Sequence, residues 1–182
     1  MEKKQEFTIT AFSENSIGLL NRITIIFTRR HLNIDSLTVS ESAIQGIYKF
    51  TIVVTTTRQM IEKVVKHIEK LVDVLKAFYL NGENIIHQEI ALYKVPTEAL
   101  TRSNDLEKII RKHNARILEV MPEYTVIEKT GHKEETQDLF EALKQFNVLQ
   151  FTRSGRVAIT KMKQEILTDF LKLLDKDEVV YN

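Results

Sequence analysis

Five residues near the N-terminus are suited to binding a small charged ligand. Asn15 and Asn33 carry amides, which can accept a hydrogen bond from an ammonium group and donate one to a carboxylate. Gly18 lets a ligand or another chain come close to the backbone, and Ile17 and Ile34 can line a small apolar pocket. In combination, these residue types suit a free amino acid with an aliphatic side chain.

A connection between a strand and a helix is expected to position the first of these residues. The segment Glu14–Leu20 precedes a predicted helix, whose N-terminus offers unpaired N–H groups and a partial positive charge to a carboxylate. Leu32–Ile34 opens the next predicted strand, and we expect both segments at the same end of the sheet. Two interpretations need no ligand. They are N-capping of the helix by Asn15 and close packing of the helix on the sheet at Gly18.

Residues typical of catalytic or metal-binding chemistry form no recognisable pattern. No histidine has a second ligand at the spacing of a metal-binding motif, and the five glycines never cluster into a phosphate-binding loop. The chain has no cysteine and no nucleophile elbow, and its carboxylates lie mostly beside lysines on polar helix faces. We therefore expect no metal site, no cofactor and no catalytic centre in this chain.

Composition excludes further classes of protein. The 182 residues are 43% apolar and 28% charged, as in a globular protein, and 26 basic residues balance 25 acidic ones. That balance argues against nucleic-acid binding, which usually needs a basic surface. No apolar run approaches the ~18 residues that span a bilayer, and no signal peptide is recognisable. We expect a cytoplasmic protein that binds neither nucleic acid nor membrane.

The first half of the chain has the order strand–helix–strand–strand–helix–strand. Phe7, Ile9 and Ala11 alternate with polar or outward residues, and Ser13–Ser16 supply candidate N-cap residues for the first helix. The predicted elements are a strand from Phe7, a helix from Leu19 to about Arg30, strands Ile34–Ser42 and Ile47–Thr55, a helix over Ile61–Leu71 and a strand Val74–Leu80.

The polar turn after residue 80 marks a boundary, and the same order then repeats. The predicted elements are strand Ile85–Val95, a helix from about Ser103 to His113, strands Ala115–Met121 and Tyr124–Thr130, helix Lys133–Phe146, a strand within Val148–Thr160 that is interrupted at Ser154-Gly155, and a helix from about Lys163 to Leu174. The prediction is an α+β protein with two tandem ferredoxin-like βαββαβ domains, 1–82 and 83–182. Each has an antiparallel sheet in the order 4-1-3-2 with helices on one face.

The second strand of the first domain is expected at the edge of its sheet. The stretch Asp35–Ser42 contains no proline or lysine that would block pairing with another chain. We therefore expect a homodimer formed by continuing the sheet.

The sequence also resembles a known family. The run from Asn15 to Ile23, followed by Phe27, Arg30 and Asn33–Val39, is similar to the N-terminal ACT domain of acetolactate synthase small regulatory subunits. The resemblance extends to Lys70–Leu75, Tyr124–Val126, Thr130-Gly131 and Arg153–Gly155, and so covers nearly the whole chain.

This resemblance implies a non-catalytic regulatory subunit that forms a homodimer through its ACT domains and activates a large catalytic subunit. The family's partner uses thiamine diphosphate, magnesium and FAD, none of which is expected in this chain. The effector is implied to be valine or a related branched-chain amino acid that acts by feedback inhibition. The ligand positions carry over to Asn15, Gly18 and Asn33, with Ile17 and Ile34 as further candidates.

One position departs from the family pattern. His31 stands where the family usually has glycine after the first helix, at a left-handed C-cap. Alternative functions are a ferredoxin-like RNA-binding module, suggested by the aromatic strand Gly46–Phe50, and a stand-alone amino-acid sensor for another partner. An effector domain of a transcription factor is less favoured because no helix-turn-helix remains.

Overall fold

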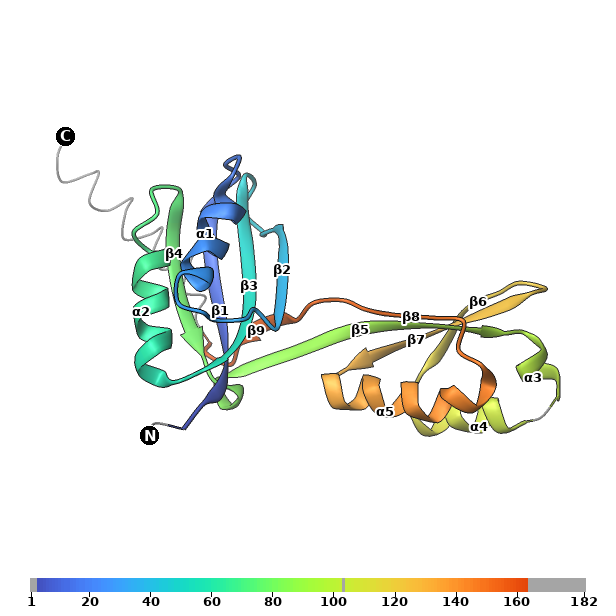
Figure 1. Cartoon of the computed structure of the whole chain (residues 1–182). Helices are drawn as coiled ribbons and strands as arrows, with labels where there is room; N and C mark the ends of the chain where they lie inside the picture. The colour runs from blue at the N-terminus through green and yellow to red at the C-terminus, as the bar shows by residue number, and fades with distance from the viewer. Residues whose placement is uncertain (1–2, 103, 164–182) are drawn as a thin grey trace. The chain divides into compact units, whose positions relative to one another are not determined.

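The computed structural model describes residues 3–102 and 104–163, which form two compact units (Figure 1). The first unit contains the chain up to Ile86 and the described residues from Ala158 onward, and the second unit is His87–Val157. The chain thus leaves the first unit four residues after the expected boundary at 82 and returns to it near the end. The helix expected from Lys163 to Leu174 lies outside the described residues, apart from its first residue.

The first unit has a four-stranded antiparallel sheet with two helices on one face, as predicted. Its strand order is β2-β3-β1-β4, which is the expected 4-1-3-2 order read from the other edge. The elements are β1 (Gln5–Glu14), α1 (Leu19–Thr28), β2 (Ser36–Glu41), β3 (Ile47–Thr56), α2 (Arg58–Ile68) and β4 (Val74–Leu80), followed by the 3-10 helix η1 (Gly82–Asn84).

Apolar periodicity explains the core of the first unit. Phe7, Ile9 and Ala11 of β1 face the helices and are almost fully buried together with Ile23 of α1 and Ile61 of α2. Burial of each phenylalanine or isoleucine side chain in this set contributes about 1.5–3 kcal/mol relative to leaving it exposed. The spacing of the apolar residues therefore accounts for the way both helices pack on the sheet.

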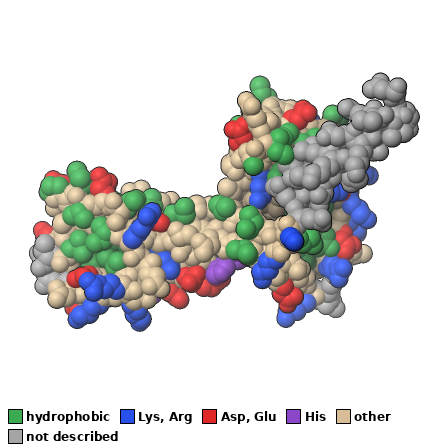
Figure 2. Space-filling view, turned by 180° about the vertical axis from the view of Figure 1, so that it is seen from behind, with side chains coloured by type: hydrophobic (Ala, Val, Ile, Leu, Met, Phe, Trp, Pro, Cys, Tyr) green, Lys and Arg blue, Asp and Glu red, His purple; other side chains and the backbone are tan. Residues whose placement is uncertain are grey.

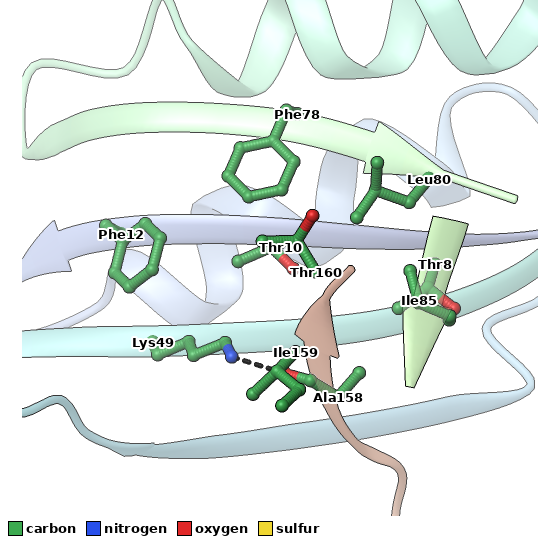
Figure 3. A pocket seen from close by; sticks show the side chains of 10 residues that line it. All are labelled: Thr8, Thr10, Phe12, Lys49, Phe78, Leu80, Ile85, Ala158, Ile159 and Thr160. Carbon is green, nitrogen blue, oxygen red and sulfur yellow. Dashed lines mark hydrogen bonds between the residues drawn. The ribbon is translucent and has the colours of Figure 1, made fainter. Parts of the chain in front are cut away.

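The opposite face of this sheet is also buried, which alternation alone did not predict. Thr8, Thr10 and Phe12 of β1 are less than a tenth exposed. Strand β9 (Val157–Thr160) lies against this face, where the Lys49 ammonium donates a hydrogen bond of 2.5 Å to the carbonyl oxygen of Ala158 (Figure 3). A segment from the far end of the sequence thus covers polar residues that the strand pattern would leave in solvent.

The second unit repeats the topology of the first. Its sheet order is β6-β7-β5-β8, with β9 pairing to β5, and its core lies between this sheet and the helices. The elements are β5 (Ile85–Pro96), α3 (Glu98–Arg102), α4 (Asp105–Lys112), β6 (Arg116–Val120), β7 (Tyr124–Gly131), α5 (Lys133–Leu143), the 3-10 helix η2 (Lys144–Phe146) and β8 (Gln150–Arg153).

Two details of the second unit differ from the sequence prediction or refine it. The helix expected from about Ser103 to His113 is present as α4, and the short helix α3, which begins at Glu98 soon after β5 ends, was not predicted. The last strand is interrupted at Ser154-Gly155 as predicted, giving β8 and β9. No helix within the described part of the chain is long and apolar enough to cross a bilayer.

Candidate functional site

Gly18 occupies a position that only glycine adopts easily. It is the N-cap of α1 with φ 80° and ψ −1°, in the left-handed region. A Cβ added at Gly18 would meet no atom within 4 Å. Close packing of the helix on the sheet is therefore not the reason for this glycine. The turn requires it, and the space beside its backbone is open.

The N-terminus of α1 is exposed and has no side-chain cap. Asn15 lies in the exposed connection after β1, so the expectation that it or a neighbouring side chain caps the helix is wrong. Within the described chain, no acceptor outside the helix takes the amides of Leu20 and Asn21 in the first turn. These N–H groups carry the partial positive charge of the helix end and suit a carboxylate.

An arginine that sequence reasoning did not single out holds this connection in place. The Arg22 guanidinium forms an ion pair with the Asp73 carboxylate and lies 3.4 Å from the Ser16 hydroxyl. The backbone N–H of Glu14 also donates to the carbonyl oxygen of Asp73, at 3.0 Å. Arg22 and Asp73 are 51 residues apart, and no local pattern pairs them. Together they tie the connection to the segment before β4.

Helix α1 ends in a left-handed turn at His31, the position where the resemblance leads us to expect glycine. His31 has φ 53°, its N–H donates to the carbonyl of Thr28, and the N–H of Leu32 donates to that of Phe27. These two bonds form a Schellman motif, with His31 at its left-handed position. Histidine therefore replaces glycine with the predicted conformation, and Asn33 follows in an exposed loop.

The two isoleucines near these loops have different environments. Ile34 is half-buried and packs against the core, so it supports the loop that carries Asn33. Ile17 is completely exposed, at 102% of its reference area. An apolar side chain left in solvent beside an uncapped helix end is available to a ligand or a second chain.

The two asparagine loops lie at opposite ends of the sheet, so the expectation that they share one end is wrong. β1 and β2 both pair antiparallel with β3 and are therefore parallel to each other. Asn15 follows the end of β1, whereas Asn33 precedes the start of β2. The ten residues of α1, about 15 Å of helix, run between them (Figure 1). One copy of the chain therefore cannot bring both amides to one small ligand.

The edge of the first sheet beside these loops remains open. Within residues 3–102 and 104–163, no strand pairs with the outer side of β2. Val39 of β2 and Leu20 and Ile25 of α1 are each more than a third exposed, in addition to Ile17. Such an edge with apolar neighbours is a surface on which a second chain can pair.

The first unit also contains a small cavity, away from the five predicted ligand residues. It has a volume of about 80 Å³ and lies between β9 and the helix-free face of the sheet, beside Phe12, Phe78 and Thr10 (Figure 3). This volume is far below the ~300–1,000 Å³ of pockets that hold drug-sized ligands. None of the five predicted ligand residues lines it.

Other chemistries find little support in the structure. No group of three or more potential metal ligands occurs among the residues that the structure describes. Phe50 is buried and Tyr48 packs against the core, so the aromatic strand does not present an exposed surface for stacking bases. His87 and His132 have ring centroids 4.5 Å apart, but no third potential ligand joins them among residues 3–102 and 104–163.

Comparison with protein families gives two matches, one for each half of the chain. Residues 9–76 match the model described as the AHAS small subunit-like ACT domain. Residues 88–162 match the model described as the small subunit of acetolactate synthase. The first match contains Asn15, Gly18 and Asn33, and the two together span almost all described residues.

Individual relatives agree with these families. The chain is 33% identical to the acetolactate synthase small subunit of Bacillus subtilis over 86% of this chain and 91% of that protein. It is 29% identical to the probable acetolactate synthase small subunit of Methanothermobacter thermautotrophicus, over 84% and 91%. The crystal structure of the Thermotoga maritima acetolactate synthase small subunit superposes with a TM-score of 0.79 and 28% identity, covering 88% of this chain and 99% of that one. The chain therefore belongs to the acetolactate synthase small subunit family.

Proposed function

We propose that this chain is the cytoplasmic regulatory subunit of an acetolactate synthase, and that it senses a branched-chain amino acid with its first domain. The observation that carries the proposal is the pair of ligand loops at opposite ends of one sheet, next to an open edge strand. In this proposal residues 1–82 hold the amino acid, residues 83–182 contribute to contact with the catalytic subunit, and the catalytic subunit supplies thiamine diphosphate, magnesium and FAD.

Pairing of two β2 strands brings the separated loops together. β1 is parallel to β2, so Asn15 lies at the end of the sheet where β2 finishes, near Glu41. A second copy that pairs its β2 antiparallel starts that strand at the same end. The partner's Asn33 then lies at the end of the sheet that holds Asn15. Two equivalent sites result, each with Asn15 and Gly18 from one copy and Asn33 from the other.

The chemistry of such a composite site suits an aliphatic amino acid. The uncapped amides of α1 receive the ligand carboxylate beside Gly18, the asparagine side-chain oxygens accept from its ammonium, and Ile17 and Ile34 flank its side chain. A ligand with the eight heavy atoms of valine, at about −0.7 kcal/mol per atom, binds with a Kd on the order of 100 μM. That affinity suits the sensing of a metabolite pool.

Regulation requires the ligand to favour one state of the dimer over another. Binding across two copies orders both loops and the β2 edge at once, and this changes the surface that the catalytic subunit meets. A typical coupling energy of ~1–3 kcal/mol corresponds to a change of about 5- to 150-fold in affinity or activation.

Mixed dimers give the sharpest test of the composite site. Asn15→Ala and Asn33→Ala chains are each expected to lose the L-valine binding that belongs to the first-unit site in isothermal titration calorimetry, whereas the exposed Asn104→Ala control retains it. When the two defective chains are refolded together, half of the dimers are mixed, and each mixed dimer has one intact site. Binding should therefore return to roughly a quarter of the wild-type sites. No recovery from well-folded mixed dimers would contradict a site shared between two copies.

The regulatory role is tested with the catalytic subunit encoded by the same organism. We expect the chain to raise acetolactate formation and L-valine to lower it again, with Asn33→Ala removing the inhibition but not the activation. Activity that is unchanged by the chain would contradict the regulatory role, whatever the result of the binding experiment.

A further inference from the structure

The helix-free face of the sheet in the second unit contains a surface cavity of about 220 Å³. Its floor consists of the aliphatic side chains of Leu92 and Val126, and charged or polar groups stand around it, among them Lys94, Glu119 and Tyr124. The volume lies below the ~300–1,000 Å³ of pockets for drug-sized ligands and therefore suits a smaller metabolite.

Strand register places the two charged residues on either side of Val126. Glu119 on β6 lies opposite Val126 on β7, and Val126 lies opposite Lys94 on β5, whose other neighbour is Gln150 on β8. Adjacent strands are about 4.8 Å apart, so the Cα atoms of Glu119 and Lys94 are separated by about 10 Å. An ammonium and a carboxylate thus face each other across an apolar strip.

A bulge in β6 is responsible for the position of the carboxylate. Ile117 lies opposite Ile127, so regular alternation would place Leu118 opposite Val126. The register shift between Ile117 and Glu119 instead brings Glu119 to that position. Bulges commonly redirect side chains in this way next to binding sites.

Neither charge is neutralised by another described residue of the unit. The Lys94 ammonium lies 3.8 Å from the centroid of the Tyr124 ring, over which it makes a cation–π contact, and it has no carboxylate partner among the described residues. Glu119 likewise has no ion pair or hydrogen bond with a described residue. In contrast, Arg116 on β6 and Glu128 on β7 form an ion pair with each other.

We propose that this cavity is a second binding site for a free α-amino acid with a short aliphatic side chain. The ligand carboxylate binds the Lys94 ammonium, its ammonium group binds the Glu119 carboxylate, and its side chain lies on Leu92 and Val126. The arrangement fits because one zwitterion with two charge-assisted hydrogen bonds of about 2.8 Å can bridge an ammonium and a carboxylate that stand on either side of one strand. The site lies wholly in the second unit, so it does not depend on the site proposed between two first units.

The test is a titration of the full-length chain with L-valine, followed by NMR of its 13C-labelled methyl groups. We use the Asn33→Ala background, so that binding at the first-unit site is absent. The methyl signals of Leu92 and Val126 should shift with saturation, and either Lys94→Met or Glu119→Gln should raise the Kd about tenfold. The matched controls, Lys112→Met and Glu123→Gln, are exposed outside the cavity and should leave the Kd unchanged.

Two ligand analogues test the recognition of both charges. Isovalerate lacks the ammonium group of valine and isobutylamine lacks its carboxylate, so both should bind at least about tenfold more weakly than L-valine. Isovalerate that binds as tightly as L-valine would overturn the zwitterion site in favour of a simple anion site. The proposal would be overturned if the methyl signals of Leu92 and Val126 did not shift even at L-valine concentrations about 50-fold above those that saturate the first-unit site. That outcome would leave the first-unit site unaffected.

Discussion

Replacement of Gly18 by alanine tests whether the backbone of the β1–α1 connection is as unusual as its geometry indicates. Gly18 has φ 80°, and a residue with a Cβ pays about 1–2 kcal/mol in this left-handed region. Alanine also reduces the entropy of the unfolded chain, which stabilises a protein by about 0.4–1 kcal/mol where the fold tolerates it. Because no atom lies within 4 Å of the added Cβ, no steric clash contributes.

Two further glycines separate these effects. Gly82 also has open space around its Cβ position but no positive φ, so Gly82→Ala reports the unfolded-state effect without the left-handed cost. Gly46 has the same φ of 80° as Gly18 and the same open surroundings. We expect the free energies of unfolding of Gly18→Ala and Gly46→Ala to lie about 1–2 kcal/mol below that of Gly82→Ala.

Urea denaturation of the full-length chain, followed by circular dichroism, gives the free energy of unfolding of all three variants, each extrapolated to water in the same way. If Gly18→Ala were as stable as Gly82→Ala, the connection would tolerate an ordinary backbone, and the argument that this turn requires glycine would fail. In the proposed site Gly18→Ala should also weaken L-valine binding more than Gly46→Ala does, because only Gly18 borders the ligand carboxylate.

Three other expectations concern single interactions. Tyr93→Phe removes a donor from a buried bond of 2.6 Å to the Thr136 carbonyl and should lower the free energy of unfolding by about 1–2 kcal/mol. Burial raises the pKa of Tyr93 to about 12, so this tyrosine ionises at lower pH in the unfolded chain than in the folded one. The free energy of unfolding of the wild type, measured in urea melts, should therefore fall between pH 10 and 12, and Tyr93→Phe should not show this fall. The backbone N–H of His132 donates a hydrogen bond of 2.7 Å to the Glu135 carboxylate, and this bond lowers the pKa of Glu135 in the folded protein. The ionised carboxylate therefore stabilises the fold above pH 4.5, and this stabilisation is lost as the pH falls through the pKa of the folded state. Glu135→Gln should therefore lose less stability on acidification. Arg22→Met breaks a partly exposed ion pair and should lower the free energy of unfolding by less than about 1 kcal/mol. Calorimetry should nevertheless show weaker L-valine binding, because the β1–α1 connection is no longer held to Asp73. An affinity equal to that of the wild type would show that this arginine does not position the site.

The spacing of apolar residues along the sequence predicted most of the helices and strands, because each of these elements buries one face. The alternation of Phe7, Ile9 and Ala11 and the helical spacing of Ile61, Val64 and Val65 correspond to elements and core residues in the structure. Strand order followed from the βαββαβ pattern, which closes in few ways. Element ends were less accurate, since caps and short helices such as α3 depend on contacts that a local pattern does not contain.

The candidate site was only partly accessible to such reasoning. Asn15, Gly18 and Asn33 were identified from residue type and resemblance, and the structure places all three in exposed connections of the first unit. Their relative position was predicted wrongly, because the direction of β2 relative to β1 depends on both strands pairing with β3. The pairing of Arg22 with Asp73 links segments distant in sequence and leaves no local signal.

The sequence by itself determined the two-domain pattern, the absence of recognisable catalytic or metal motifs, and the family, because periodicity and motif are properties of neighbouring residues. Tertiary structure alone decided three further points. β9 returns to cover the first sheet, the two asparagine loops point to opposite ends of that sheet, and a bulge turns Glu119 toward Lys94. Each depends on strand direction or register, where a change of one residue or one pairing moves a side chain to another face. In the two proposed sites, those choices decide which polar groups one ligand can reach at the same time.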